Sequence, residues 1–231
     1  MKRVILVILL ALLVPIATAD PLDDANTAYN RGDYAEALRL LRELVEQDNA
    51  KAQYNLGVMY ATGQGVPQDY AEAVSWYRKA AEQGDANAQF TLGIMYDQSR
   101  GVPQDYAEAM RWYRKAAEQD DANAQFTLGI MYDQGKGVPQ NFAEAQRWYR
   151  KAAEQRHLSA QFKLGYMYYR GRGVPQDYVK AHKWWNLVAT AGRASAVAAR
   201  NDLAELMTPE EIAEAEKLAL EWVEKQKNSE P

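Results

Sequence analysis

The chain has 231 residues, of which 48% are hydrophobic and 25% charged, as is ordinary for a folded protein with a sizeable core. Its formal net charge of −4 disfavours nucleic acid and anionic membranes as partners, because both require clustered lysine and arginine. The absence of cysteine excludes disulfides, thiolate metal sites and cysteine nucleophiles.

Residues 1–19 have the pattern of a secretory signal peptide. Lys2 and Arg3 precede the uninterrupted apolar run 4–14, and residues 17–19 form a small-x-small cleavage site. The run is too short to span a membrane. We therefore expect cleavage after Ala19 and a periplasmic or secreted protein without stable membrane insertion; the alternative is an uncleaved anchor.

Residues 20–49 are expected to form a divergent first unit that caps the chain. Two helical stretches are joined by the short turn Arg31-Gly32-Asp33. The glycine-rich loop found in the later units is missing here.

Residues 50–193 contain four copies of a 36-residue pattern, which we call units 1 to 4: 50–85, 86–121, 122–157 and 158–193. Units 2 and 3 differ at only seven positions. A fixed period of this length is typical of a solenoid, in which each unit buries its apolar face against its neighbours.

Each unit is predicted to begin with a helix that has one apolar face. In unit 1 this helix covers residues 51–62 and carries Ala52, Leu56, Met59 and Tyr60 on its core face. A glycine recurs inside the helix in every unit, although glycine costs about 1 kcal/mol there. Close contact with a neighbouring helix is the expected reason for Gly57, Gly93, Gly129 and Gly165.

A loop containing Gly-Val-Pro-Gln leads to the second helix of each unit. In unit 1, Asp69 is the expected N-cap, and Glu72 completes a capping-box pattern. The second helix, residues 70–83, alternates aromatic residues with alanines, which allows close helix packing. Recurrence in register favours packing over a sugar platform for Trp76, Trp112, Trp148 and Trp184.

Residues 194–227 are predicted to form a pair of capping helices, followed by a tail at 228–231. The first helix covers 194–206. The second has a strong start signal at Thr208-Pro209-Glu210-Glu211, with threonine as the N-cap and proline at the first helical position.

The full pattern, AxAQxxLGxMYxxGxGVPQDYxxAxxWYxKAAEQ, resembles the Sel1-like repeat family, a relative of the tetratricopeptide repeat. The first unit is more similar to a tetratricopeptide repeat. The resemblance implies an all-α fold, a right-handed α/α superhelical solenoid that acts as an adaptor or a ligand-binding scaffold. Some secreted relatives are rich in disulfides and bind β-lactams, but this chain lacks the cysteines of that subgroup.

In a solenoid of helical hairpins, the first helices are expected to line the inner, concave surface. The face opposite their core stripe then carries an aromatic row and an aliphatic row, flanked by polar positions. An apolar stripe bordered by hydrogen-bonding groups is typical of a peptide groove, although the alternative is that adjacent helices bury the rings. The candidate binding residues are Tyr54, Asn55, Val58, Phe90, Thr91, Ile94, Asp97, Gln98, Phe126, Thr127, Ile130, Asp133, Gln134, Phe162, Lys163, Tyr166, Tyr169 and Arg170.

The sequence gives little reason to expect an enzyme. His157 and His182 lack partners at metal-ligand spacing, and no phosphate-binding loop is present. We therefore expect no cofactor and no catalytic residue, and a monomer that binds a protein or peptide of the envelope or the secreted space. The alternatives are a β-lactam or cell-wall-fragment binding or hydrolysing protein, and an array that self-associates through its ends.

Overall fold

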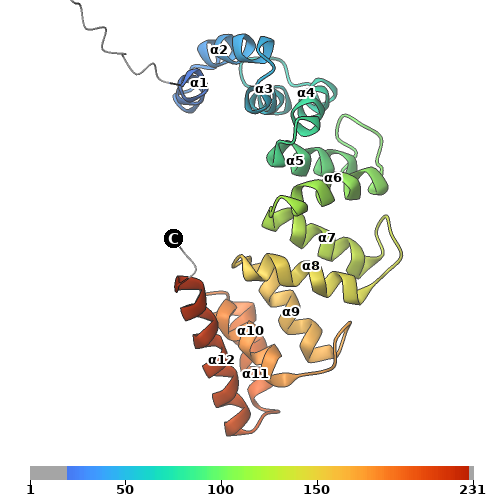
Figure 1. Cartoon of the computed structure of the whole chain (residues 1–231), viewed down its shortest axis with the longest axis vertical. Coiled ribbons are helices and arrows are strands. Elements are labelled where there is room, and N and C mark those ends of the chain that lie inside the picture. The colour runs from blue at the N-terminus through green and yellow to red at the C-terminus, as the bar shows by residue number, and fades with distance from the viewer. Residues whose placement is uncertain (1–19, 229–231) are drawn as a thin grey trace, which may run out of the picture.

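A computed structural model describes residues 20–228. This part of the chain contains twelve helices and no strand, in the arrangement shown in Figure 1. The predicted signal peptide and the last three residues of the predicted tail lie outside the described residues. The helices are α1 (Pro21–Asn30), α2 (Tyr34–Glu46), α3 (Ala50–Thr62), α4 (Tyr70–Glu82), α5 (Ala86–Asp97), α6 (Tyr106–Glu118), α7 (Ala122–Gln134), α8 (Phe142–Glu154), α9 (Leu158–Arg170), α10 (Tyr178–Thr190), α11 (Ala194–Ala204) and α12 (Pro209–Asn228).

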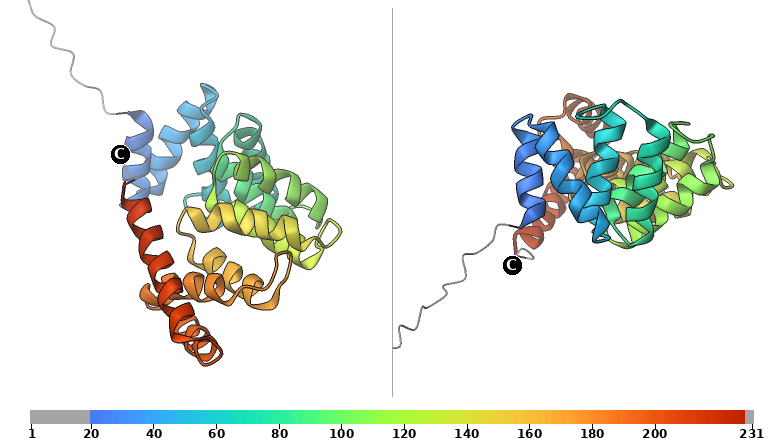
Figure 2. Two further views of the ribbon diagram at one scale, coloured as in Figure 1. Left: turned by 60° about the horizontal axis from the view of Figure 1, so that its bottom comes forward. Right: turned by 90° about the horizontal axis from the view of Figure 1, so that it is seen from above.

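The helices stack as successive hairpins along a curved array. In Figure 1, α3 and α5 lie on the inner side of the arc relative to α4 and α6. The views in Figure 2 show that the array also winds out of a plane, and both figures place α1 and α12 on the open side of the arc. The predicted α/α superhelical solenoid is confirmed.

The glycine inside each first helix allows an aromatic ring of the second helix to lie against the backbone. A Cβ atom added at Gly129 would lie 2.4 Å from Cδ1 of Tyr149. At Gly165 it would lie 2.4 Å from Cδ1 of Trp185. Both distances are far below van der Waals contact, so these positions accept no side chain without movement. The predicted close approach of a neighbouring helix is confirmed.

A row of buried glutamines joins each unit to the next. Gln125 is 1% exposed; its side chain donates to the Ala117 carbonyl of the preceding unit at 3.1 Å and accepts from Gln155 at 2.9 Å. Gln89 makes the equivalent pair of bonds with Ala81 and Gln119. Buried polar groups are expensive unless they are paired. These bonds therefore fix how one unit sits on another, and the sequence analysis missed them.

The glycine-rich loop of each unit packs on the preceding unit. Gly137 has φ 73°, and a Cβ there would lie 2.8 Å from both Cβ and the carbonyl oxygen of Tyr106. The following Gln140 ties the loop down by donating to the Asp133 carbonyl at the end of α7, at 2.7 Å. Glycine is required here both for its backbone angle and for the space.

The predicted N-cap is confirmed, but the capping box of unit 1 is not formed. Asp69 accepts from the backbone N–H groups of Ala71 and Glu72. Its own N–H donates to the Tyr60 carbonyl at 2.9 Å, so the Glu72 carboxylate is free to accept from Trp76 at 2.9 Å. The sequence pattern could not show that a carbonyl of α3 accepts from the Asp69 N–H.

The C-terminal helices cover the last repeat, because α11 and α12 both pack on α10. Here the capping box is complete: the Thr208 N–H donates to Glu211 at 2.9 Å, and the Glu211 N–H donates to the Thr208 hydroxyl at 3.3 Å. The predicted start of α12 is therefore confirmed. Helix α11 ends at Ala204, two residues earlier than expected.

Candidate binding surface

The predicted binding residues all lie in the first helices of units 1 to 4, or, for Gln98, immediately after one. Most of them are half-buried, and three are exposed: Gln98, Gln134 and Arg170. The half-buried residues are Tyr54, Asn55 and Val58 in α3; Phe90, Thr91, Ile94 and Asp97 in α5; Phe126, Thr127, Ile130 and Asp133 in α7; and Phe162, Lys163, Tyr166 and Tyr169 in α9.

The aromatic row belongs partly to the packing of each hairpin. Each of its rings lies against an aromatic ring of the second helix in the same unit, and no ring pair among the described residues joins two members of the row. The centroid distances are 5.6 Å for Tyr54–Tyr77, 5.5 Å for Phe90–Tyr113, 5.7 Å for Phe126–Tyr149 and 6.1 Å for Phe162–Trp185. Each ring is therefore partly covered by its own hairpin, and less ring surface is left for a partner than the sequence pattern indicates.

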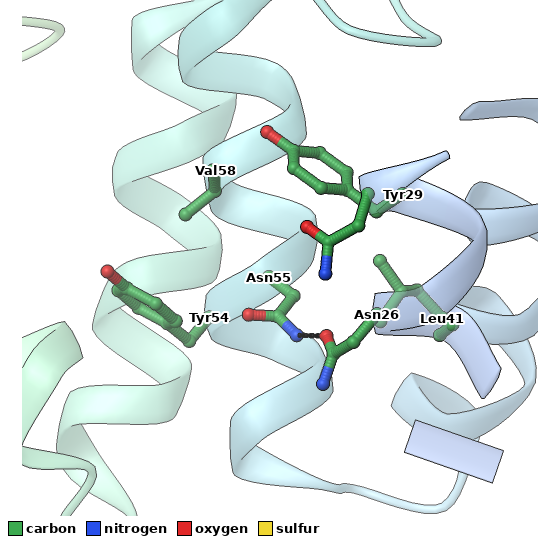
Figure 3. Close-up of a pocket in the computed structure, with 8 residues that line it drawn as sticks. Asn26, Tyr29, Leu41, Tyr54, Asn55 and Val58 are labelled. Atoms are coloured by element: carbon green, nitrogen blue, oxygen red, sulfur yellow. Dashed lines mark hydrogen bonds between the residues drawn. The ribbon is translucent and has the colours of Figure 1, made fainter. Parts of the chain in front are cut away.

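A pocket of about 450 Å³ opens between α1, α2 and α3, at the N-terminal end of the surface. Figure 3 shows Asn55 of α3 and Asn26 of α1 pointing toward each other, with Tyr29 of α1 and Tyr54 and Val58 of α3 around them. Buried Leu41 of α2 also lines the pocket. Three candidate residues thus line one concave site, together with residues that the sequence analysis assigned only to a cap.

Two side-chain amides meet at the edge of this pocket. Asn55 Nδ2 donates to Asn26 Oδ1 at 2.8 Å. Neither amide makes another side-chain hydrogen bond within the described part of the chain, so Asn26 Nδ2 remains available as a donor and Asn55 Oδ1 as an acceptor. A carboxamide offers the same two groups as a peptide unit.

The two candidate carboxylates in the middle of the surface are each near a cation. Lys136, in the loop after α7, reaches back across the unit boundary to Asp97 at 2.5 Å and also lies over the ring of Tyr106. Lys163 of α9 lies 3.9 Å from Asp133 of α7. The second contact joins the first helices of units 3 and 4, and the first joins the loop of unit 3 to the first helix of unit 2.

The second-helix tyrosines reach this surface beneath the first helices. Burial, followed by the negative charge of Asp97, raises the pKa of Tyr113. Burial and Asp133 act in the same way on the pKa of Tyr149. The hydroxyls therefore remain protonated at ordinary pH and act as neutral groups beside the carboxylates.

Unit 4 differs from the others at this surface. The guanidinium of Arg170 lies 5.1 Å from the ring centroid of Tyr169 and 5.8 Å from that of Tyr166. Arg172, in the loop after α9, also lies 5.8 Å from the Tyr166 ring and 5.3 Å from that of Phe142. Two arginines and several rings thus form a basic-aromatic cluster at the C-terminal end of the surface.

The surroundings of both histidines indicate structural roles. His157 is the N-cap of α9: its Nδ1 accepts from the Ala160 N–H at 3.1 Å, and its ring lies 4.5 Å from that of Phe126. His182 is 2% exposed in α10. Within residues 20–228 no group of three or more histidine, aspartate or glutamate side chains could hold a metal ion.

The tryptophans in register pack as expected. Trp112, Trp148 and Trp184 are buried, whereas Trp76 is half-buried under Lys79.

No helix between Asp20 and Asn228 combines the length and apolar character needed to cross a bilayer.

The Sel1 repeat family model matches residues 50–85, 86–121, 122–157 and 158–192, more than half of the chain. The chain belongs to the Sel1 repeat family. Sel1-repeat proteins are generally non-enzymatic scaffolds for protein–protein interactions. The family match provides no support for the alternative of β-lactam or cell-wall-fragment chemistry.

Solved structures agree with this membership. A Sel1 repeat protein from Oxalobacter formigenes is 33% identical with a TM-score of 0.75, over 91% of this chain and 86% of that one. The c5321 protein, described as a protective antigen present in uropathogenic Escherichia coli strains with an SLR fold, is 36% identical with a TM-score of 0.78. That match covers 90% of this chain but only 45% of the c5321 chain.

A more distant structure shows likeness of fold alone. PilF of Pseudomonas aeruginosa is 21% identical, with a TM-score of 0.57 over 91% of this chain and 90% of that one. No curated protein matches the Sel1 chain at a significant level.

Sequence reasoning missed several residues of this Sel1 surface. Asn26 and Tyr29 were overlooked because the first unit was interpreted as a cap. The loop position after the first helix was overlooked because its neighbours are glycines or serine. That position is polar in every unit but differs in residue type, a pattern that could have indicated a binding position. It is occupied by Gln64, Arg100, Lys136 and Arg172.

Proposed function

We propose that this protein is a non-enzymatic scaffold of the bacterial cell envelope or the secreted space, and that its inner surface binds a protein or peptide. The envelope location rests on the leader pattern of residues 1–19. The scaffold role rests on family membership and on the pocket between α1, α2 and α3. We expect the protein to bind as a monomer.

The pocket is the observation that carries the proposal. Its apolar wall, formed by Tyr54, Val58 and Leu41, suits one side chain of a bound segment. At the edge, Asn26 retains a donor and Asn55 an acceptor. An extended peptide presents one N–H and one C=O at each residue, so its main chain can bind both amides while a side chain fills the pocket.

The side-chain amides of Asn26 and Asn55 keep a defined spacing because α1 and α3 are held in place. Hydrogen bonds from α1 and α2 to the loop of unit 1 hold this end of the array in place: Tyr29 donates to Gln64, and Gln64 donates to the Tyr34 hydroxyl at 2.9 Å. A site held on rigid helices loses little conformational entropy on binding, which favours affinity.

Selection with phage-displayed random peptides tests the proposal. We expect the purified protein to enrich peptides that bind the pocket. The double variant Asn26→Ala/Asn55→Ala should bind those peptides about tenfold more weakly, because main-chain hydrogen bonds are lost. Circular dichroism should show unchanged helicity.

The matched control is Ser75→Ala/Glu82→Ala, which alters two exposed residues of α4. It should bind the selected peptides like the wild type. Enrichment of no peptide would contradict the proposal, and so would equal loss of binding in the control.

A further inference from the structure

Unit 4 replaces four inner-surface residues of unit 3 while keeping the packing residues of the same helix. Helices α7 and α9 share the residues that pack inward, including a buried glutamine, a buried leucine and the helical glycine. The inner positions change together in charge and size. The pairs are Thr127 and Lys163, Ile130 and Tyr166, Asp133 and Tyr169, and Gln134 and Arg170.

These replacements leave an excess of positive charge. Lys163 is 3.9 Å from Asp133, a long separation for an ion pair, and its side chain remains 40% exposed. Neither Arg170 nor Arg172 forms an ion pair with a carboxylate of residues 20–228. The cluster therefore contains three cationic side chains and only one neighbouring carboxylate, that of Asp133.

The other carboxylates near the cluster are already engaged. Asp177 and Glu211 flank Tyr178, whose ring stacks on that of Tyr169. Asp177 pairs with Lys180 at 2.7 Å, and Glu211 accepts from the Thr208 N–H. Neither carboxylate forms an ion pair with Arg170 or Arg172 in the described part of the chain.

At the equivalent loop position of unit 3, the cation has a carboxylate partner. Lys136 has the place in unit 3 that Arg172 has in unit 4, and each lies over the first aromatic ring of the preceding second helix. Lys136 is neutralised by Asp97 at 2.5 Å. The carboxylate equivalent to Asp97 is Asp133, and it faces Lys163 instead.

The two guanidinium groups lie near the same aromatic ring. Both arginines lie 5.8 Å from the ring centroid of Tyr166. Stacking on a ring orders the planar group while leaving its N–H donors free. Such donors match the two oxygens of a carboxylate.

We propose that Lys163, Arg170 and Arg172 bind an acidic segment of a peptide, with the rings of Tyr166 and Tyr169 contacting the aliphatic stems of its aspartate or glutamate side chains. This inference rests on the proposed function, since it assigns a partner chemistry to the C-terminal end of the same surface. The acidic segment would occupy unit 4 while another part of the peptide reaches toward α1 and α3.

The surroundings favour a peptide over a nucleic acid or a membrane. The chain as a whole is acidic, with a net charge of −4, so a long polyanion would meet repulsion beyond this cluster. The cluster is confined to α9 and the loop after it, and its three cations suit a short acidic segment better than an extended anionic surface.

The test compares labelled peptides on the purified protein by fluorescence anisotropy. The first probe is a short peptide with clustered glutamates, and the second is its glutamine counterpart. We expect the glutamate peptide to bind at least about tenfold more tightly, with a preference that falls as salt rises.

Residues from other units provide the variant. Lys163→Thr and Arg170→Gln introduce the side chains of unit 3, and Arg172→Gln introduces that of unit 1, so the same helix and loop already accept them. The triple variant should lose the preference for glutamate. The matched control, Arg111→Gln/Arg147→Gln/Lys217→Gln, removes the same charge from exposed positions and should retain it.

The outcomes separate this inference from the proposed function. A preference for glutamate that survives the triple variant, or that is lost equally in the control, would overturn the inference. Binding of inorganic phosphate or of phosphatidylglycerol vesicles through these residues, without binding of the glutamate peptide, would also overturn it. If Asn26- and Asn55-dependent peptides still bind in either case, the proposed function stands; if no peptide binds, both fall.

Discussion

Helices α7 and α9 show which positions of a repeat are fixed by packing and which are free. They share the residues that face the second helix and the preceding unit: Gln125 and Gln161 are both buried, and Gly129 and Gly165 both lie against an aromatic ring. They differ at the candidate binding positions, where unit 3 is almost neutral and unit 4 is basic and aromatic. The fold is therefore specified by one set of positions, while binding chemistry can change at another.

The helical glycine gives the largest expected effect. Gly129→Ala would place a Cβ 2.4 Å from the Tyr149 ring, so we expect a loss of about 1–3 kcal/mol in the free energy of unfolding. In an unconstrained helix the same change would stabilise by about 1 kcal/mol, so the sign of the effect is decisive. Urea unfolding provides the measurement.

A second background checks the cause. When Tyr149→Ala has removed the ring, Gly129→Ala should become neutral or stabilising. If Gly129→Ala destabilises equally in both backgrounds, the Tyr149 ring is not what excludes a side chain at this position.

The buried glutamine row gives an effect of similar size. Gln125→Ala would remove two hydrogen bonds, one to the Ala117 carbonyl and one from the Gln155 amide, at a cost of about 1–3 kcal/mol in the free energy of unfolding. Gln134→Ala, on the exposed inner surface of the same helix, should change it by less than about 0.5 kcal/mol. Equal effects in thermal unfolding would remove the distinction between packing and inner positions.

The N-cap residue His157 should make the free energy of unfolding depend on pH. Burial lowers the pKa of His157 below its ordinary value of 6.5, and its Nδ1 must be unprotonated to cap α9. The unfolded chain therefore binds this proton more readily than the folded chain. The stability that the neutral ring contributes is complete above about pH 6.5 and is lost as the pH falls below it.

The variant His157→Asp restores the N-cap residue of units 2 and 3. Its free energy of unfolding should fall less between about pH 7.5 and 5.5 than that of the wild type. Burial also lowers the pKa of His182, so part of the acid sensitivity should remain. A wild-type pH dependence identical to that of the variant would show that the His157 cap does not titrate in this range.

The smallest expected effect concerns the ion pair across the boundary of units 2 and 3. Lys136→Gln removes the partner of Asp97, and both side chains are partly exposed. We expect a loss of less than about 1 kcal/mol in the free energy of unfolding, which salt should reduce further. A larger, salt-insensitive loss in urea unfolding would mean that Lys136 supports packing instead of charge neutralisation.

Local signals predicted much of this fold. The cap residue Asp69, the start of α12 at Thr208-Pro209 and the glycine at position 57 each depend on neighbours in the sequence or on a repeated register. The candidate surface was predicted as a set of rows because a helical period fixes which residues share a face. Contacts between units depend on how far the array curves, and no local pattern gives that.

The missed contacts illustrate this limit. The distance between Lys136 and Asp97 depends on the stagger of two units, and the partnership of Asn26 with Asn55 depends on where α1 lies beside α3. The half-buried state of Phe126 likewise depends on Tyr149 of the second helix. In each case the residue type was visible in the sequence, but its partner was not.

Site-specific photo-cross-linking to a selected peptide tests most directly whether the inner surface is the binding surface. A photoreactive residue would replace Gln98 or Gln134 on the inner side, and Ser75 or Arg147 on the outer side; all four positions are exposed. We expect peptide adducts from the two inner positions and none above background from the two outer positions. Adducts from the outer positions alone would contradict an inner binding surface.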